Sequence, residues 1–383
     1  MASIAKAKIA ITAAVSASSR HAVPLLDLGR ELVEATFVRR PSARNRSPYV
    51  ADVRLARDGR IAIAHVPSLD MGGKMRVPGT RMLLRPARDR KGALVGANAL
   101  GRYGTPKCEF IAQLLRCAEP ENAHLNGGRG VWVGCHPRIG EDIANALLLN
   151  NHLAPALAPV AALAREVKGI AGEGSRADFV ATHPDGSRTV VECKTVVDTD
   201  YDPATPPDRS VAPTKKGGAK GKGKGKGKGK GEGKSSSGGG GSSGDCVFLG
   251  PVAPGAPYAR AAIFPWGRGN QRGPDGEKVV SARAIKHVDE LRALASGARR
   301  GPSGERLGAA ALFVVVREDA ASFRPNREAC PSLARHLEAA RAAGVAVVAH
   351  RVRWGEGADR GKAFHEGALP VDFRDYTAAG KQG

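Results

Sequence analysis

The sequence predicts a mixed α/β protein, with a small β-barrel near the N-terminus and a mixed sheet flanked by helices in the C-terminal part. Three observations support this fold class: short alternating strands precede residue 104, a hairpin pattern lies near residue 185, and helix and strand patterns alternate after residue 280. With 383 residues, 42% of them hydrophobic, the chain is long enough for two domains with sizeable cores.

The predicted barrel begins with a hairpin. Residues 53–55 and 61–63 alternate apolar and polar side chains on either side of an Asp-Gly turn, which is typical of paired strands. Residues 80–87 and 92–98 read as further short strands. Several short strands within roughly 70 residues, separated by turns, favour a barrel of the OB type.

Helical spacing is predicted from the segment CEFIAQLLRCAE (108–119) onward. The later elements are helices over 140–153, 158–167, 281–296 and 330–344, and strands over 309–319 and 345–352. The helix over 281–296 is amphipathic, and the strand over 309–319 is a continuous apolar run typical of a buried strand. The strand over 345–352 is expected to be the last.

Composition shifts set the domain boundaries. Residues 1–30 have no acidic side chain before Asp27 and are rich in Ala, Ser, Lys and Arg, which is typical of an organelle transit peptide. An untargeted flexible N-terminus and a secretory signal are the alternatives. Residues 201–245 are of low complexity, rich in Gly, Lys and Ser, and are expected to be disordered because they cannot bury a core. The remaining units are the barrel over 31–104, the α/β domain over 105–200 and 246–355, and a tail over 356–383.

The chain is strongly basic, with 59 Lys and Arg against 37 Asp and Glu and a formal net charge of +22. The lysine-rich run over 214–234 contributes +8, so the rest of the chain still carries +14. Nucleic acid, DNA in the first place, is the natural polyanionic partner; a solvated cationic surface is the alternative. Four arginines are candidates to follow a phosphate backbone or to form a solvated basic loop: Arg39, Arg40, Arg44 and Arg46.

The six cysteines are scattered, with no CxxC spacing, so reduced thiols and an intracellular compartment are expected, organellar if the leader is a transit peptide. No apolar run approaches the roughly 18 residues that span a bilayer, so no membrane partner is expected. The sequence leaves the oligomeric state open.

Three charged residues interrupt the predicted hairpin, which is expected to close at residues 183–186. Glu192 and Lys194 are two apart and share one face of a strand, and Asp178 lies on the partner strand. Two carboxylates and an ammonium can hold Mg²⁺, or Mn²⁺, against a phosphate and place a water for attack. The alternative is an exposed cross-strand salt bridge, which contributes only about 0–1 kcal/mol.

The segments REVKGIAGEGSRADFV and RTVVECKTV resemble the core motif of the sugar fermentation stimulation protein family (SfsA). Weaker blocks follow in the same order from about residue 37 to 352, apart from the insert. The sequence departs from the family pattern at Phe264-Pro265-Trp266, where the family has Phe-Pro-Asp, and in the block starting at His65. The resemblance implies an OB-like N-terminal domain, a PD-(D/E)XK nuclease-like C-terminal fold and DNA binding.

The resemblance also implies roles for individual residues. Asp178 and Glu192 match the metal-binding acids of that fold, Lys194 its lysine, and Glu166 its additional acid on the preceding helix. Arg176 is placed to contact the scissile phosphate or to pair with Asp178, Ser175 to position the turn, and His287 is read as structural. A Mg²⁺-dependent nuclease and a noncatalytic DNA-binding or regulatory protein with the same fold both remain open, as does a cationic protein that contacts other proteins.

Overall fold

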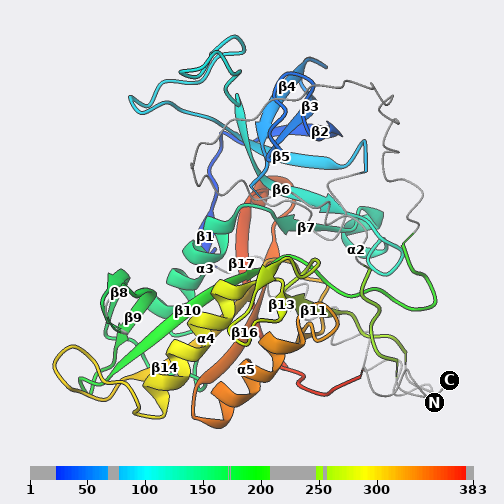
Figure 1. Cartoon of the computed structure of the whole chain (residues 1–383). Coiled ribbons are helices and arrows are strands. Elements are labelled where there is room, and N and C mark those ends of the chain that lie inside the picture. Colours follow the sequence, from blue (N-terminus) through cyan, green and yellow to red (C-terminus); the bar gives the residue numbers. More distant parts are fainter. Residues whose placement is uncertain are drawn as a thin grey trace, which may run out of the picture.

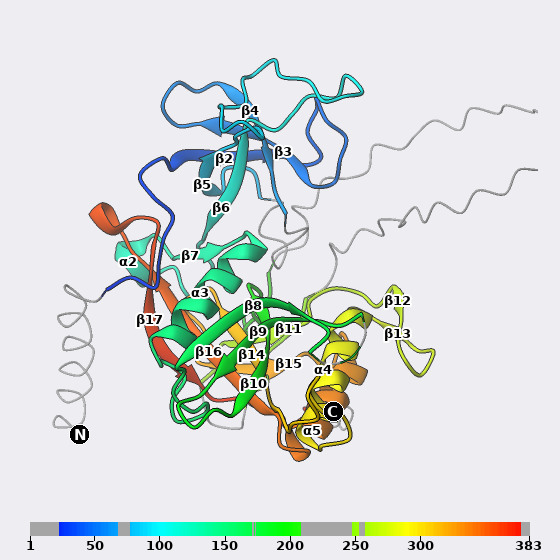
Figure 2. The same cartoon turned by 90° about the vertical axis from the view of Figure 1, so that its left-hand side faces the viewer.

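The computed structural model describes residues 23–67, 77–170, 172, 174–207, 247–252 and 257–376. The chain forms a small barrel and, below it, a larger curled sheet flanked by helices (Figures 1 and 2). The predicted mixed α/β fold class is therefore confirmed. The expected leader up to residue 22 and the expected disorder over 208–245 lie outside the described residues.

Five strands close the barrel. They are β2 (Val33–Arg39), β3 (Val50–Leu55), β4 (Ile61–His65), β5 (Arg81–Pro86) and β6 (Phe110–Cys117). Their order is β4-β3-β2-β5-β6, and a pairing of β4 with β6 closes the ring. β7 (Val131–Gly134) adds a sixth strand next to β6. Val53, Leu84 and Leu115 are among the fully buried side chains that fill the barrel.

Two predictions for this part of the chain were wrong. Residues 92–98 form no strand, and only isolated bridges join Arg88 to Leu94 and Leu100 to Pro106. Helical spacing was predicted over 108–119, but this segment forms β6 and carries the barrel sheet beyond residue 104. Leu115 faces the barrel core and Leu114 faces the core of the other half, so both faces of β6 are apolar and the period of two is hidden.

A seven-stranded sheet forms the larger half, in the order β1-β17-β16-β14-β10-β9-β8. The strands are β1 (Leu26–Asp27), β8 (Ala162–Lys168), β9 (Arg176–Thr182), β10 (Arg188–Val196), β14 (Gly308–Val315), β16 (Ala346–Trp354) and β17 (Lys362–Leu369). The central strands β10, β14 and β16 are parallel, whereas the other neighbours pair antiparallel.

Helices cover both faces of this sheet. α3 (Pro137–Leu149) packs on one face, and α4 (Ala282–Ala295) and α5 (Pro331–Ala342) pack on the other. The shorter elements are α2 (Leu125–Gly128), η3 (Gly357–Asp359), the pair β11 (Ala261–Phe264) and β15 (Ser322–Pro325), and the pair β12 (Gln271–Arg272) and β13 (Lys278–Val279). No helix in the described ranges is long and apolar enough to cross a membrane.

The sheet differs from the prediction at both edges. The segment 158–167, predicted as a helix, contributes to β8, which pairs with β9 at every position except Glu166. Its alanine-rich sequence favours a helix. Backbone hydrogen bonds to the edge of β9 outweigh this local helix propensity. The expected tail contains β17, and the expected leader contains β1, whose Leu26 pairs with Ala363.

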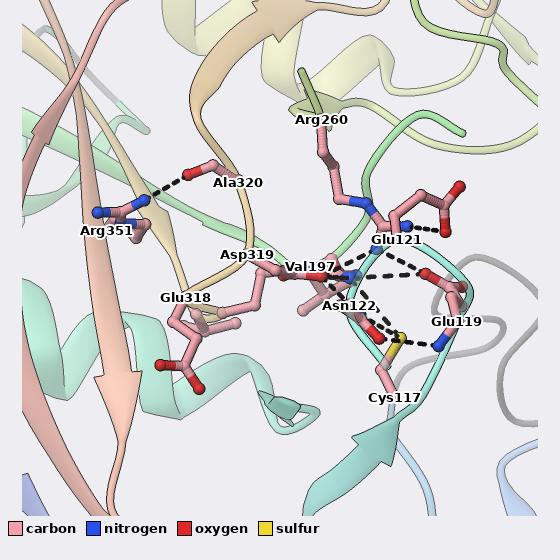
Figure 3. Close-up of polar contacts among 12 residues, drawn as sticks. Cys117, Glu119, Glu121, Asn122, Val197, Arg260, Glu318, Asp319, Ala320 and Arg351 are labelled. Carbon is pink, nitrogen blue, oxygen red and sulfur yellow. Dashed lines mark hydrogen bonds and ion pairs between the residues drawn. The ribbon is translucent and has the colours of Figure 1, made fainter. Parts of the chain in front are cut away.

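A buried ionic cluster joins the two halves (Figure 3). Asp319, just after β14, accepts hydrogen bonds from Arg260 at 2.8 Å and from Asn122 at 2.7 Å. Arg260 also pairs with Glu119 and Glu121, at 2.6 Å each, on the connection between β6 and β7. The cluster therefore ties the barrel side of the molecule to the central sheet.

A second buried feature predicts sensitivity to acid. His350 on β16 is 1% exposed, and neither ring nitrogen has a partner among the described residues. Its ring lies 4.8 Å from that of His365, which in turn stacks on His152 at 4.3 Å. Burial, followed by the neighbouring His365, His152 and Arg351, lowers the pKa of His350 to about 3.

We expect His350 to reduce stability as the pH falls below about 6.5, because the unfolded chain then binds a proton that the folded chain excludes. Between the pKa of His350 in the folded chain and its pKa in the unfolded chain, the free energy of unfolding should change by up to about 1.4 kcal/mol per pH unit because of this residue. Urea unfolding at pH 7, 6 and 5 measures it. His350→Leu should flatten the dependence, whereas His124→Gln, at an exposed site, should not; equal slopes for wild type and His350→Leu would contradict the expectation.

Candidate functional site

The site lies where the β9–β10 hairpin opens. As predicted, the hairpin turns at residues 183–186, with the His183 N–H donating to the Ser187 carbonyl at 2.8 Å. Regular pairing runs to Val191 and Phe179 and then ends. At that point the Cys193 N–H donates to the Asp178 carboxylate at 2.8 Å. The Asp178 side chain therefore replaces a strand carbonyl and fixes the fork between the two strands.

Glu192 and Lys194 lie on β10 next to this fork. Val190 belongs to the core under α4, whereas Val191 and Cys193 face α3, so Glu192 lies on the α4 side of the sheet. Glu192 is 7% exposed, and one of its carboxylate oxygens accepts hydrogen bonds from the Lys194 ammonium and from His287. Asp178, Glu192 and Lys194 are thus brought together.

The two carboxylates have opposite pKa shifts. Burial raises the pKa of Asp178, the charge of Glu192 raises it further, and the Cys193 N–H, Lys194 and His287 only partly oppose this. Burial also acts to raise the pKa of Glu192, but the hydrogen bond from His287 and the charge of Lys194 outweigh it, so the net pKa is lowered. Glu192 is therefore held ionised, and ionisation of Asp178 is unfavourable because it would place a second negative charge next to Glu192.

His287 on α4 was read from the sequence as structural, yet it contacts Glu192 directly. Arg283, one turn earlier, points its Nε–H at His287 Nε2 at 3.3 Å. Because a guanidinium can only donate, Nε2 is the acceptor in this contact, and Nδ1 faces Glu192. The pair therefore orients the Glu192 carboxylate from the helix side.

Glu141 was missed by the sequence reasoning. It lies in the first half of α3, half-buried, and burial raises its pKa first, followed by the charge of Asp178. Its position depends on Gly140, where an added Cβ would lie 2.0 Å from the Thr195 hydroxyl of β10. Only glycine lets α3 approach β10 this closely. The available signal was the acid next to a glycine at the start of a correctly predicted helix.

Glu166 does not lie on a helix, as the resemblance implied, but on the edge strand β8. Its φ of +51° is in the left-handed region, and its side chain is 66% exposed, 3.8 Å from the half-exposed Arg176. Arg176 therefore pairs with Glu166 in this structure. Ser175 donates to the Gly172 carbonyl at 2.6 Å and so stabilises the turn before β9.

A cavity of about 780 Å³ opens at the start of α3, and Asp178, Glu192 and Lys194 are not among its lining residues. It is lined by the barrel residue Pro67, by the start of α3 and by β8; the polar lining side chains are His136, Arg138, Glu141, Arg165 and Glu166. Arg165 is also held by Asp142 at 3.1 Å. The cavity therefore combines two guanidinium groups with an acid that interacts with Asp178.

The predicted basic loop of the barrel does not line this cavity. Arg39 lies 3.8 Å from the buried Asp52, and Arg44 donates to the Ala97 carbonyl at 2.8 Å. Arg46 is exposed, and Arg40 is partly buried. The arginine-rich loop and the acid cluster thus occupy separate regions of the molecule.

No group of three or more His, Cys, Asp or Glu side chains in the described part of the chain is arranged to hold a metal ion. The donor set at the fork is smaller but chemically suitable. Asp178 uses only Oδ2 and Glu192 only Oε1 in hydrogen bonds to described residues. One oxygen of each carboxylate therefore remains for a hard cation.

Comparisons with known proteins give three similarities. Residues 274–358 match the family model described as the sugar fermentation stimulation protein RE domain. A sugar fermentation stimulation protein homolog from Carboxydothermus hydrogenoformans is 37% identical over 71 residues, which span 18% of this chain and only 27% of that relative. The structure of Pyrococcus furiosus SfsA in complex with Ca²⁺ superposes with a TM-score of 0.51 at 17% identity, covering 92% of this chain and 100% of the other. At this identity the structural similarity concerns the fold.

Proposed function

We propose that this chain, which belongs to the sugar fermentation stimulation protein family, hydrolyses phosphodiester bonds in nucleic acid, with DNA as the first candidate substrate. The observation that carries the proposal is the convergence of Asp178, Glu192 and Lys194 where β9 parts from β10. A half-buried carboxylate whose pKa is raised by burial and then by a second carboxylate is a typical functional-site feature.

The donor set fits Mg²⁺ or Mn²⁺. Mg²⁺ is commonly held by one or two carboxylates and completed by waters and substrate phosphates, so a group of three protein ligands is not required. The P. furiosus structure was obtained with Ca²⁺, which prefers the same oxygen donors. When bound, such a cation neutralises phosphate charge and lowers the pKa of a coordinated water.

The residues of the chain have distinct parts in this proposal. Asp178 and Glu192 offer their remaining oxygens to the cation, and His287 keeps Glu192 oriented. Lys194, whose side chain is 22% exposed, stabilises negative charge that develops on the phosphate. Arg138 and Arg165, which line the cavity next to Glu141, contact the phosphate backbone.

A cleavage assay on single- and double-stranded DNA and RNA tests the proposal. We expect cleavage with Mg²⁺ or Mn²⁺, none with EDTA, and a fall of about 100-fold or more for Glu192→Gln. Glutamine can still accept from Lys194 and His287, so the fold is kept. Glu338→Gln is the matched control, because Glu338 on α5 is 38% exposed and does not line the cavity, and its rate should change by no more than about twofold.

The alternative is a noncatalytic nucleic-acid-binding protein with the same fold. The lack of a preformed group of three ligands in the described residues favours it. A folded wild type that binds nucleic acid but cleaves no substrate with either metal would establish the binder and end the nuclease proposal. Binding that does not weaken as salt is raised would contradict both, because phosphate contacts release counterions.

A further inference from the structure

The connection between β5 and β6 forms a long arm over residues 87–109. In Figure 1 it is the cyan tube that leaves the far end of the barrel in two lobes, away from α4 and α5. Each lobe ends in a tight turn: the Gly92 N–H donates to the Asp89 carbonyl at 3.0 Å, and the Gly104 N–H to the Gly101 carbonyl at 3.1 Å. The arm is therefore built from ordered turns that hold their tips outward.

Both tips present cations. Arg90 and Lys91 occupy the first turn, Arg102 the second, and Lys107 follows it; all four are exposed. None of them has an ion pair to a described residue. The acids of the arm are engaged elsewhere: Asp89 accepts the Lys91 and Ala93 N–H groups at 2.8 and 3.0 Å, and the buried Glu109 pairs with Arg60 at 2.7 Å. The surface charge of the tips is thus mainly positive.

The second tip also exposes an aromatic ring. Tyr103 is 86% exposed, and the Arg102 guanidinium lies 5.7 Å from its ring centroid. Leu94 and Leu100, on the same arm, are 61% and 57% exposed. Neighbouring cations and an open aromatic face together form the pattern that binds single-stranded nucleic acid, because phosphates meet the cations and an unpaired base stacks on the ring.

The arginine-rich loop of the barrel packs on this arm. Arg44 donates to the Ala97 carbonyl at 2.8 Å, and Asn45 donates to the Pro106 carbonyl at 3.0 Å. The buried Asp52 fixes the loop by accepting from Ser42 and from the Ala43 N–H at 2.9 Å. The exposed Arg46 therefore extends the cationic surface of the arm.

We propose that the arm binds single-stranded nucleic acid, with Tyr103 stacking on a base and the cations at the tips contacting the backbone. This inference rests on the proposed function for its ligand class, but it concerns a surface separate from the acid cluster.

Fluorescence anisotropy of the full chain with a labelled oligothymidine of about 20 nucleotides tests the arm, in low salt and EDTA. Tyr103→Ala should weaken binding by about 5- to 100-fold, whereas Tyr103→Phe, which keeps the ring, should stay within about twofold. Affinity falls as salt is raised, so the slope of log affinity against log salt is negative. The double replacement Arg90→Gln and Lys91→Gln should make this slope shallower by about 1.4. Wild-type affinity for Tyr103→Ala would overturn the proposal, and so would tighter binding of a duplex of equal length that is unaffected by Tyr103→Ala.

The outcomes separate this inference from the proposed nuclease activity. If wild type cleaves and Tyr103→Ala binds and cleaves equally well, the arm proposal fails alone. If Tyr103→Ala weakens binding while wild type never cleaves, the arm is supported and the nuclease proposal fails. If wild type binds no nucleic acid at all, both fail.

Discussion

Replacing Asp178 with asparagine should abolish metal-dependent cleavage and, at the same time, make the metal-free protein more stable. We expect a rate loss of about 1000-fold, equivalent to about 4 kcal/mol, because a neutral amide is a poor ligand for a hard cation. The asparagine carbonyl can still accept from the Cys193 N–H, so the fork is preserved. Stability should rise because burial and Glu192 raise the pKa of Asp178, which makes its ionised form unfavourable at neutral pH.

The pH dependence gives this prediction a second readout. Because the folded-state pKa of Asp178 lies above its usual value, the cost of its charge disappears as the pH falls through that raised pKa. The stability advantage of Asp178→Asn in urea unfolding should therefore shrink on acidification. Added Mg²⁺ should raise the Tm of wild type but not that of the variant. A variant that loses stability at pH 7.5, or that keeps cleaving, would contradict the assignment.

The hairpin could be predicted from sequence because its information is local. The turn residues set the reversal, and a period of two places Glu192 and Lys194 on one face. Helix α4 could be predicted equally well, since Ile285, Val288, Leu291 and Leu294 repeat with helical spacing and are all buried. In both segments, local propensity and tertiary environment agree.

The rest of the site depends on contacts between distant segments. The charge of Asp178 acts on Glu141 because Gly140 on α3 fits against Thr195 on β10, and no spacing rule connects these positions. The resemblance assigned the acid of the preceding helix to Glu166, but the alanine-rich segment around it, which has high helix propensity, forms an edge strand. The functional residues that were missed are those positioned by packing rather than by local pattern.

The second large effect concerns stability. Asp319→Asn should lower the free energy of unfolding by about 3–5 kcal/mol, because it removes the nearest counter-ion of the buried Arg317. Arg317, fully buried, donates to both carboxylate oxygens of Asp319 at 2.6 Å. Arg260 and Asn122 donate to the second oxygen (Figure 3). Burial acts to raise the pKa of Asp319, but these arginines outweigh it and hold the pKa far below its usual range.

Urea unfolding of matched variants decides whether the loss comes from the uncompensated charge. Asp359→Asn, which removes a carboxylate 55% exposed and 2.8 Å from Lys362, should cost less than about 1 kcal/mol. The double variant Asp319→Asn and Arg317→Met should be more stable than Asp319→Asn alone, because it also removes a buried unpaired charge. If the double variant is no more stable than Asp319→Asn alone, the cluster stabilises the fold through packing and not through charge compensation.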